Sequence, residues 1–265
     1  MADNPLIKLV IESFDIYFLI FARMLGIFLT APFFSRREIP AVFKITLSVI
    51  ISYMLLPFLA STVTISHNFL NVFMISIKEF AAGAAIGLTA QMLFNVFLAA
   101  GAQNDLQMGL SMAQQVDPST GSQITNSGNL IVGFAYLIFL ATDAHHIFLR
   151  GIINSYDILP IGAAVFKSSN FLNYIIKLML YFAETSLLIV IPIVIILFLG
   201  NLLLAFLAKI MPQMNVFIVG MPFKILIGFV AMVIIFPHMK EVIKQVFESM
   251  IKYEYLLMRI LGSSA

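Results

Sequence analysis

The sequence contains no cysteine, and charged residues make up only 11% of its 265 residues. Without cysteine the chain has no disulfide, no thiol nucleophile and no cysteine-based metal site. The net charge is +2, and no cluster of basic residues accompanies it, which argues against nucleic-acid binding. The composition therefore argues against a disulfide-stabilised protein, a thiol enzyme, a cysteine-based metal protein and a nucleic-acid-binding protein.

Motifs of catalysis are also missing. The chain has no G-x-S-x-G nucleophile elbow, no H-E-x-x-H zinc motif and no phosphate-cradling P-loop. Asp143, His145 and His146 lie close in sequence, but a zinc site needs further ligands. The three side chains either satisfy polar groups between helices, which we favour, or form a proton relay. The sequence therefore predicts no enzyme, no cofactor and no metal.

Apolar residues dominate what is present. They make up 61% of the chain, the mean hydropathy is +1.03, and apolar runs of eighteen or more residues recur. Such runs are typical of transmembrane helices, so we expect an all-α polytopic membrane protein. The segment Met1–Pro5 lacks the basic start and small-residue cleavage site of a signal peptide. We therefore expect the first apolar run to be retained.

A single membrane domain over residues 1–265 is expected to have four parts. They are N-terminal helices (14–100), a long polar interval (101–129), C-terminal helices with a hairpin (130–236) and an amphipathic tail helix (237–265). Two apolar runs are too long for a bilayer core of about 30 Å: as straight helices, 69–100 and 171–211 would measure about 48 and 60 Å. Such overlong runs must tilt, kink or leave the membrane.

The polar interval 101–129 separates two hydrophobic runs and contains no lysine or arginine. Asp117-Pro118 followed by Ser119-Thr120-Gly121 indicates a turn. A polar segment between membrane helices must face water, protein or a lumen. From its residues alone it is more often an ordinary loop than a functional one; the functional alternative is that it lines or closes a passage.

Charged residues inside the apolar runs are the next candidates. Ionisable side chains at such depth usually pair across helices, and we interpret them first as assembly contacts; they are Arg23, Lys78, Glu79, Glu184 and Lys224. Gly83 and Gly87, four residues apart on a small-residue face, allow close helix approach. Internal packing is the favoured interpretation of these glycines, and contact with another subunit is the alternative.

The distribution of positive charge does not give a consistent topology. If the turn at Arg36 and Arg37 is cytoplasmic, alternation places the interval 101–129, which has no lysine or arginine, inside and places Arg150, Lys167 and Lys177 outside. Together with the overlong helices, this conflict favours assembly into a larger object over a simple bundle in lipid.

Three spaced blocks resemble one protein family. They are the N-terminal block 22–26, 31–35 and 39–40 with Lys44; the central block 106–113 and 116–118; and the C-terminal block 212–217 and 220–222 with Gly228. Their order and spacing resemble FliR, the flagellar export-gate family related to the SctT proteins of type III secretion injectisomes. Ala144 stands before the paired histidines where the family would have glycine, so no role is carried onto His145 and His146.

The resemblance implies a core component of the flagellar protein export gate in the bacterial inner membrane. Such a protein assembles with FliP and FliQ inside the basal body, with much of the gate above the bilayer, and FlhB is a further partner. A FliP-like part would precede a FliQ-like hairpin, and unfolded subunits would pass through the pore. The matched C-terminal block makes Pro212 and Gln213 additional candidates for assembly.

The central block matches the plug of that family. The expected plug residues are Gln107, Met108, Gly109, Leu110, Ser111, Met112, Asp117 and Pro118. Methionine supplies adaptable apolar bulk for a seal, and glycine permits a sharp bend. Two alternatives remain: the SctT component of a virulence injectisome, or a secondary transporter, for which no convincing internal repeat is found. The block 212–217 favours flagella.

Overall fold

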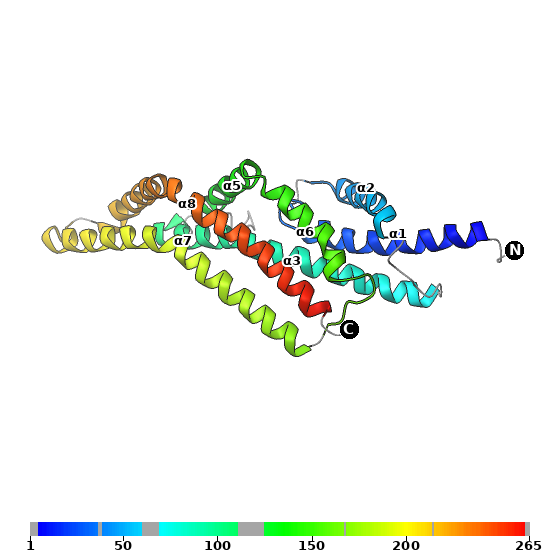
Figure 1. Ribbon diagram of the computed structural model, residues 1–265. Coiled ribbons are helices and arrows are strands. Elements are labelled where there is room, and N and C mark those ends of the chain that lie inside the picture. The colour runs from blue at the N-terminus through cyan, green and yellow to red at the C-terminus, as the bar shows by residue number, and fades with distance from the viewer. Residues whose placement is uncertain are drawn as a thin grey trace. The chain divides into compact units, whose positions relative to one another are not determined.

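The structure, a computed structural model, describes residues 5–36, 39–59, 69–110, 125–166, 168–213 and 215–262, and their regular structure is entirely helical. The helices are α1 (Pro5–Thr30), α2 (Ala41–Leu59), α3 (Phe69–Met108), α5 (Asn126–Ala141), α6 (Ala144–Ile158), α7 (Ser168–Ile210) and α8 (Val216–Gly262) (Figure 1). Four of them, α2, α3, α7 and α8, are long and apolar enough to cross a membrane, and α5 with α6 adds a fifth span if the pair counts as one broken helix. The predicted all-α polytopic membrane protein is confirmed.

Four helix boundaries differ from expectation. Helix α1 begins at Pro5, nine residues before the expected start of the N-terminal helices at residue 14. Helix α3 continues eight residues into the polar interval and ends at Met108. Helix α8 runs through Pro222 and Pro237, so the tail after residue 236 is not a separate helix. The apolar stripe of the tail is buried at Met239 and Ile243, and this packing keeps the helix continuous past the proline. The first of the expected C-terminal helices is interrupted between α5 and α6, where Asp143 has φ 54°, a conformation that aspartate tolerates better than most residues.

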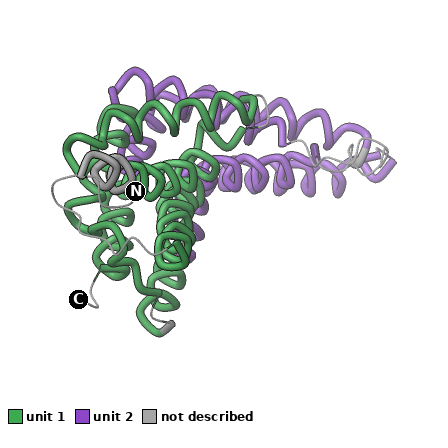
Figure 2. Tube along the Cα trace, turned by 90° about the vertical axis from the view of Figure 1, so that its right-hand side faces the viewer, with its two compact units in different colours: residues 1–93, 145–178, 248–265 green, residues 94–144, 179–247 purple. Residues whose placement is uncertain are grey.

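Contacts divide the chain into two compact units (Figure 2). Unit 1 comprises residues 1–93, 145–178 and 248–265, and unit 2 comprises residues 94–144 and 179–247. Each unit is described by itself.

Close approach of α1 and α3 organises unit 1. A Cβ atom on Gly83 would meet the backbone oxygen of Arg23, and one on Gly26 would meet the backbone oxygen of Phe80. At Gly87 a Cβ atom would meet the Thr30 hydroxyl, with Ile27 O only 2.8 Å away. Glycine at these positions lets two helix backbones touch, as small-residue faces do in membrane helices.

Helix α2 has its polar side buried. Lys44, Ser48 and Ser52 are buried, and the two serine hydroxyls donate to the carbonyls four residues earlier at 2.8 and 2.6 Å. The opposite side is apolar and exposed, with Val42, Tyr53 and Phe58 each more than 70% exposed. Because this side has no cover from its own chain in the described residues, it suits hydrocarbon or another protein.

An aromatic cluster fills the core of unit 2. Phe94 on α3 stacks on Tyr136 of α5, with ring centroids 4.5 Å apart. Phe247 on α8 lies edge-on to Phe139 at 5.1 Å and to Phe97 at 6.3 Å. Such edge-to-face and stacked pairs add to the burial of the rings themselves. The cluster holds the C-terminal part of α3 against α5 and α8.

The α7–α8 hairpin is also visible in unit 2. A Cβ atom on Gly220 of α8 would lie 3.1 Å from Leu204 of α7, and one on Gly200 of α7 would lie 3.6 Å from Ile227 of α8. The predicted return of the chain after residue 211 is therefore observed, with α7 ending at Ile210 and α8 beginning at Val216.

Candidate functional site

The candidate site lies in unit 2, where α3 ends. Met108 is the last residue of α3 and is fully buried, and Gly109 leaves the helix with φ 82°. A left-handed glycine is the usual way for a helix to stop, since other L-residues are strained there. The N–H of Gly109 donates to Leu106 O at 3.2 Å. The sharp bend predicted at Gly109 is therefore present.

Asp105 joins the end of α3 to the start of α5. Its side chain is 1% exposed, and both carboxylate oxygens accept the backbone N–H of Ser127 at 3.2 Å. Ser127 is in the first turn of α5, where N–H groups lack helical partners and the helix dipole favours negative charge. The N-cap residue, Thr125, makes no side-chain capping bond. A carboxylate from another helix thus takes the place of the local cap.

Replacing Asp105 with alanine should therefore destabilise the protein more than replacing the N-cap residue. Asp105→Ala leaves a buried N–H without its acceptor, at a cost of about 1–3 kcal/mol. Thr125→Ala removes no capping bond and should cost at most about 0.5 kcal/mol. Unfolding of the purified chain by sodium dodecyl sulfate titration measures both. Equal losses would contradict the cross-helix cap.

A second close contact lies beside this cap. A Cβ atom on Gly101 of α3 would meet the Cα and N atoms of Gly128 in α5, with the carbonyl carbon of Ser127 2.6 Å away. The two helices therefore touch backbone to backbone one turn before Asp105. The contacts of Asp105 with Ser127 and of Gly101 with Gly128 therefore hold the end of α3 against the start of α5.

Met108 fills a position that depends on glycine in α8. A Cβ atom on Gly228 would lie 2.7 Å from Cγ and 3.0 Å from Sδ of Met108. The thioether also lies 4.0 Å from the Ser127 hydroxyl. Methionine adapts to irregular spaces of this kind. Met108 is thus packed into unit 2 and anchors the segment that follows it.

A cavity of about 490 Å³ opens beside the same residues, between the end of α3 and the α7–α8 hairpin. Its polar lining comes from Gln107, Asn201 and Lys224. The Asn201 Oδ1 atom is buried without a hydrogen-bond partner among the described residues. Lys224 is half-buried and forms no ion pair within the described ranges. The cavity therefore offers amide and ammonium groups with unused hydrogen-bonding capacity.

The predicted plug residues divide into two groups. Gln107, Met108, Gly109 and Leu110 lie at the end of α3 as described, with Gln107 and Leu110 half-buried. Ser111, Met112, Asp117 and Pro118 lie outside the described residues. The structure thus shows how the segment is anchored at its start.

Of the predicted assembly residues, Arg23 forms the most extensive network, and it lies in unit 1. Arg23 and Glu79 are both fully buried and pair with Nε and Oε2 2.5 Å apart. Arg23 Nη1 donates to Leu159 O at 2.8 Å, and Glu79 Oε1 accepts the N–H of Gly162 at 2.8 Å. The guanidinium lies 4.3 Å from the centroid of the Tyr156 ring. One ion pair thus connects α1, α3, α6 and the turn after α6.

The remaining assembly candidates lie apart from one another. Gly83 and Gly87 pack against α1 inside unit 1, and Lys224 lines the cavity in unit 2. Glu184, Pro212 and Gln213 are exposed. A role for any of them in contact with other proteins stays a prediction.

Sequence reasoning missed the anchor formed by Asp105, Ser127, Gly101 and Gly128. One signal was present: Asp105 lies in a stretch without lysine or arginine, so a buried carboxylate there must accept backbone N–H groups. The partner residue could not be found without the fold. The rings of His145 and His146 lie 4.1 Å apart between centroids, tilted by 44° to each other, at the start of α6, and no role is assigned to them.

These features define a class: a polytopic helical membrane protein with overlong helices and a segment anchored at both ends. The model of a family described as "Bacterial export proteins, family 1" matches residues 14–250, and the chain belongs to this family, that of the FliR proteins. The flagellar biosynthetic protein FliR of Bacillus subtilis is 30% identical over 259 residues, covering 96% of this chain and 99% of that protein.

Two further relatives agree. The flagellar biosynthetic protein FliR of Escherichia coli is 28% identical over 84% of this chain and 85% of its own length. The protein of the same name from Aquifex aeolicus is 27% identical over 94% of this chain and 97% of its own length. The chain is therefore a transport component of the bacterial export machinery rather than an enzyme.

Proposed function

We propose that this chain is a core component of the flagellar protein export gate, assembled with FliP and FliQ, and that residues 107–118 plug its pore. The family and the names of the relatives support the export role, and those names favour a flagellum over an injectisome. Unfolded flagellar subunits are the proposed cargo, and FlhB is a further proposed partner.

The main structural support for the plug is the set of contacts that joins α3 to α5 at the two ends of the segment. Asp105 and Ser127 are bonded at 3.2 Å, and Gly101 touches Gly128. The end of α3 and the start of α5 are therefore held together at the two places where the chain leaves one helix and enters the other. A segment without lysine or arginine also offers passing polypeptides no fixed cationic site. These are the properties that a seal for cargo of any sequence requires.

Deleting Leu110 to Pro118 tests the plug. Nine of the sixteen residues between Met108 and Thr125 are removed, and the remaining seven reach about 23 Å when extended, so the two anchored ends stay joined. Cells that carry the variant should leak ions, measured as membrane conductance. Gly133→Ala serves as the control, since a Cβ atom there has no neighbour within 4 Å. Unchanged conductance with normal assembly would refute the seal.

Membership of the gate is tested separately by co-expression with FliP and FliQ. The chain should purify with both in one stable complex. A chain that purifies alone as a monodisperse bundle and binds a small solute would instead favour a secondary transporter.

A further inference from the structure

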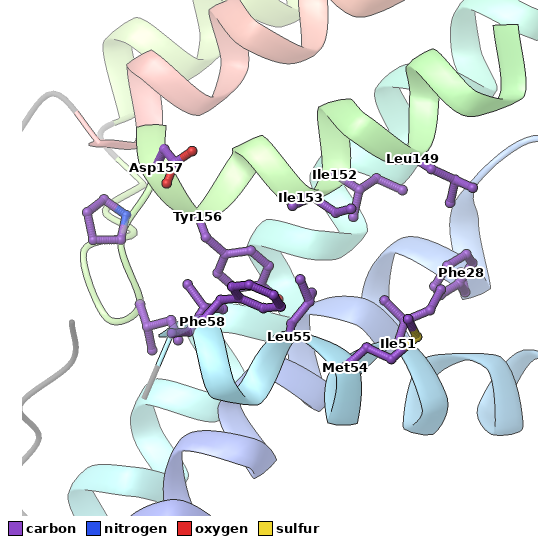
Figure 3. A pocket seen from close by; sticks show the side chains of 13 residues that line it. Phe28, Ile51, Met54, Leu55, Phe58, Leu149, Ile152, Ile153, Tyr156 and Asp157 are labelled. Carbon is purple, nitrogen blue, oxygen red and sulfur yellow. The ribbon is translucent and has the colours of Figure 1, made fainter. Parts of the chain in front are cut away.

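A cavity of about 950 Å³ lies in unit 1, far in sequence from the plug. Its walls come from α1, α2, α6 and the turn after α6 (Figure 3). This volume and a mostly apolar lining are typical of sites that bind small molecules. Along α6 the lining extends from Leu149 to Asp157, about 12 Å at the helical rise of about 1.5 Å per residue.

The cavity has one polar end. Asp157 lies at one end, and Phe28 and Leu149 lie at the other (Figure 3). Asp157 is exposed, and its carboxylate makes no hydrogen bond or ion pair with any residue in the described part of the chain. The lining contains no lysine, arginine or histidine. The hydroxyl of Tyr156 is already used, since it donates to Ile20 O at 3.3 Å.

The cavity continues into a surface suited to hydrocarbon. Met54 and Phe58 line it and are 64% and 76% exposed, and both belong to the outward apolar side of α2. Helix α2 is also a candidate membrane span. An acyl chain can therefore enter from the bilayer without crossing a polar surface.

We propose that this cavity binds a phospholipid with a primary amine in its head group, of the phosphatidylethanolamine type. The acyl chain lies between α2 and α6 toward Phe28 and Leu149, and the ammonium pairs with Asp157. An anionic head group would meet an acidic residue and no cation from the lining. The lipid thus fills the space between two helices of unit 1, and this proposal does not depend on the plug.

The full-length chain in membranes tests the proposal. A phosphatidylethanolamine with a diazirine in its acyl chain is incorporated and activated, and the labelled peptides are mapped by mass spectrometry. Labels should concentrate on the cavity-facing residues of α2 and α6. The substitutions Ile153→Trp and Met54→Trp fill the cavity and should lower this labelling at least tenfold, because they should weaken lipid binding at least tenfold. Val233→Trp, at an exposed apolar position of α8, should leave it unchanged.

The head group is tested by native mass spectrometry of lipid retained by the purified chain. Wild type should retain phosphatidylethanolamine over phosphatidylglycerol, and Asp157→Asn should lower that preference about threefold, as for a partly exposed ion pair. Labels spread evenly over α7 and α8, or an Asp157→Asn preference equal to wild type, would overturn the proposal. So would a photo-reactive residue at position 153 that captures another protein in place of lipid.

Discussion

Glu79→Gln is expected to lower the free energy of unfolding by about 3–5 kcal/mol, because it leaves the buried charge of Arg23 without its counter-charge. Both side chains are fully buried, and Nε and Oε2 are 2.5 Å apart. Glutamine has the shape of glutamate and can still accept the N–H of Gly162, so the variant removes charge and little else. Lys78→Gln, at the exposed position next to it, should change stability by at most about 0.5 kcal/mol.

A second substitution separates loss of charge from loss of packing. Arg23→Met combined with Glu79→Gln removes both charges, and a neutral pair of similar volume is often as stable as a buried ion pair. The double variant should therefore be more stable than Glu79→Gln alone. Sodium dodecyl sulfate titration of the purified chains gives the coupling between the two sites. A Glu79→Gln chain within about 1 kcal/mol of wild type, or a double variant no better than the single one, would contradict this account.

The ion pair also shows what sequence could and could not predict. Arg23 and Glu79 stood out because ionisable residues in apolar runs need partners. Their pairing followed only from the crossing of α1 and α3, which Gly26 and Gly83 permit. The backbone acceptor of Arg23, the carbonyl of Leu159 just after α6, had no signal in sequence, since any carbonyl near a helix end can serve.

The ends of the helices could likewise be predicted only in part from sequence. Polarity predicted that residues 101–129 leave the helical runs, yet α3 continues to Met108. Asp105 explains the difference: it is 1% exposed and takes its hydrogen-bond partner, Ser127, from α5. The amphipathic pattern predicts a separate tail helix over 237–265, but α8 runs through Pro237, and packing on both sides of this proline keeps the helix continuous. Local preference is overridden where tertiary contacts supply what the local sequence lacks.

The contact between Gly101 and Gly128 leads to the last expectation. Glycine to alanine inside a helix ordinarily stabilises it by about 1 kcal/mol. At Gly133 on α5 no atom lies within 4 Å of the new methyl group, so this gain should appear there. At Gly101 the methyl group would fall on the backbone of Gly128, which has no side chain that could move away. The helices would have to separate.

Gly101→Ala should therefore lose about 3 kcal/mol, at the upper end of the cost of overpacking, while Gly133→Ala should gain about 1 kcal/mol. Separation of the helices would also lengthen the 3.2 Å bonds between Asp105 and Ser127, which hold both ends of the proposed plug. Cells with Gly101→Ala should consequently leak ions, as is expected of the deletion of residues 110–118, at a temperature where the chain still accumulates. Unfolding midpoints and membrane conductance measure the two effects. If Gly101→Ala is as stable as Gly133→Ala, the backbone contact is absent; if it is unstable but does not leak, the anchor does not control the seal.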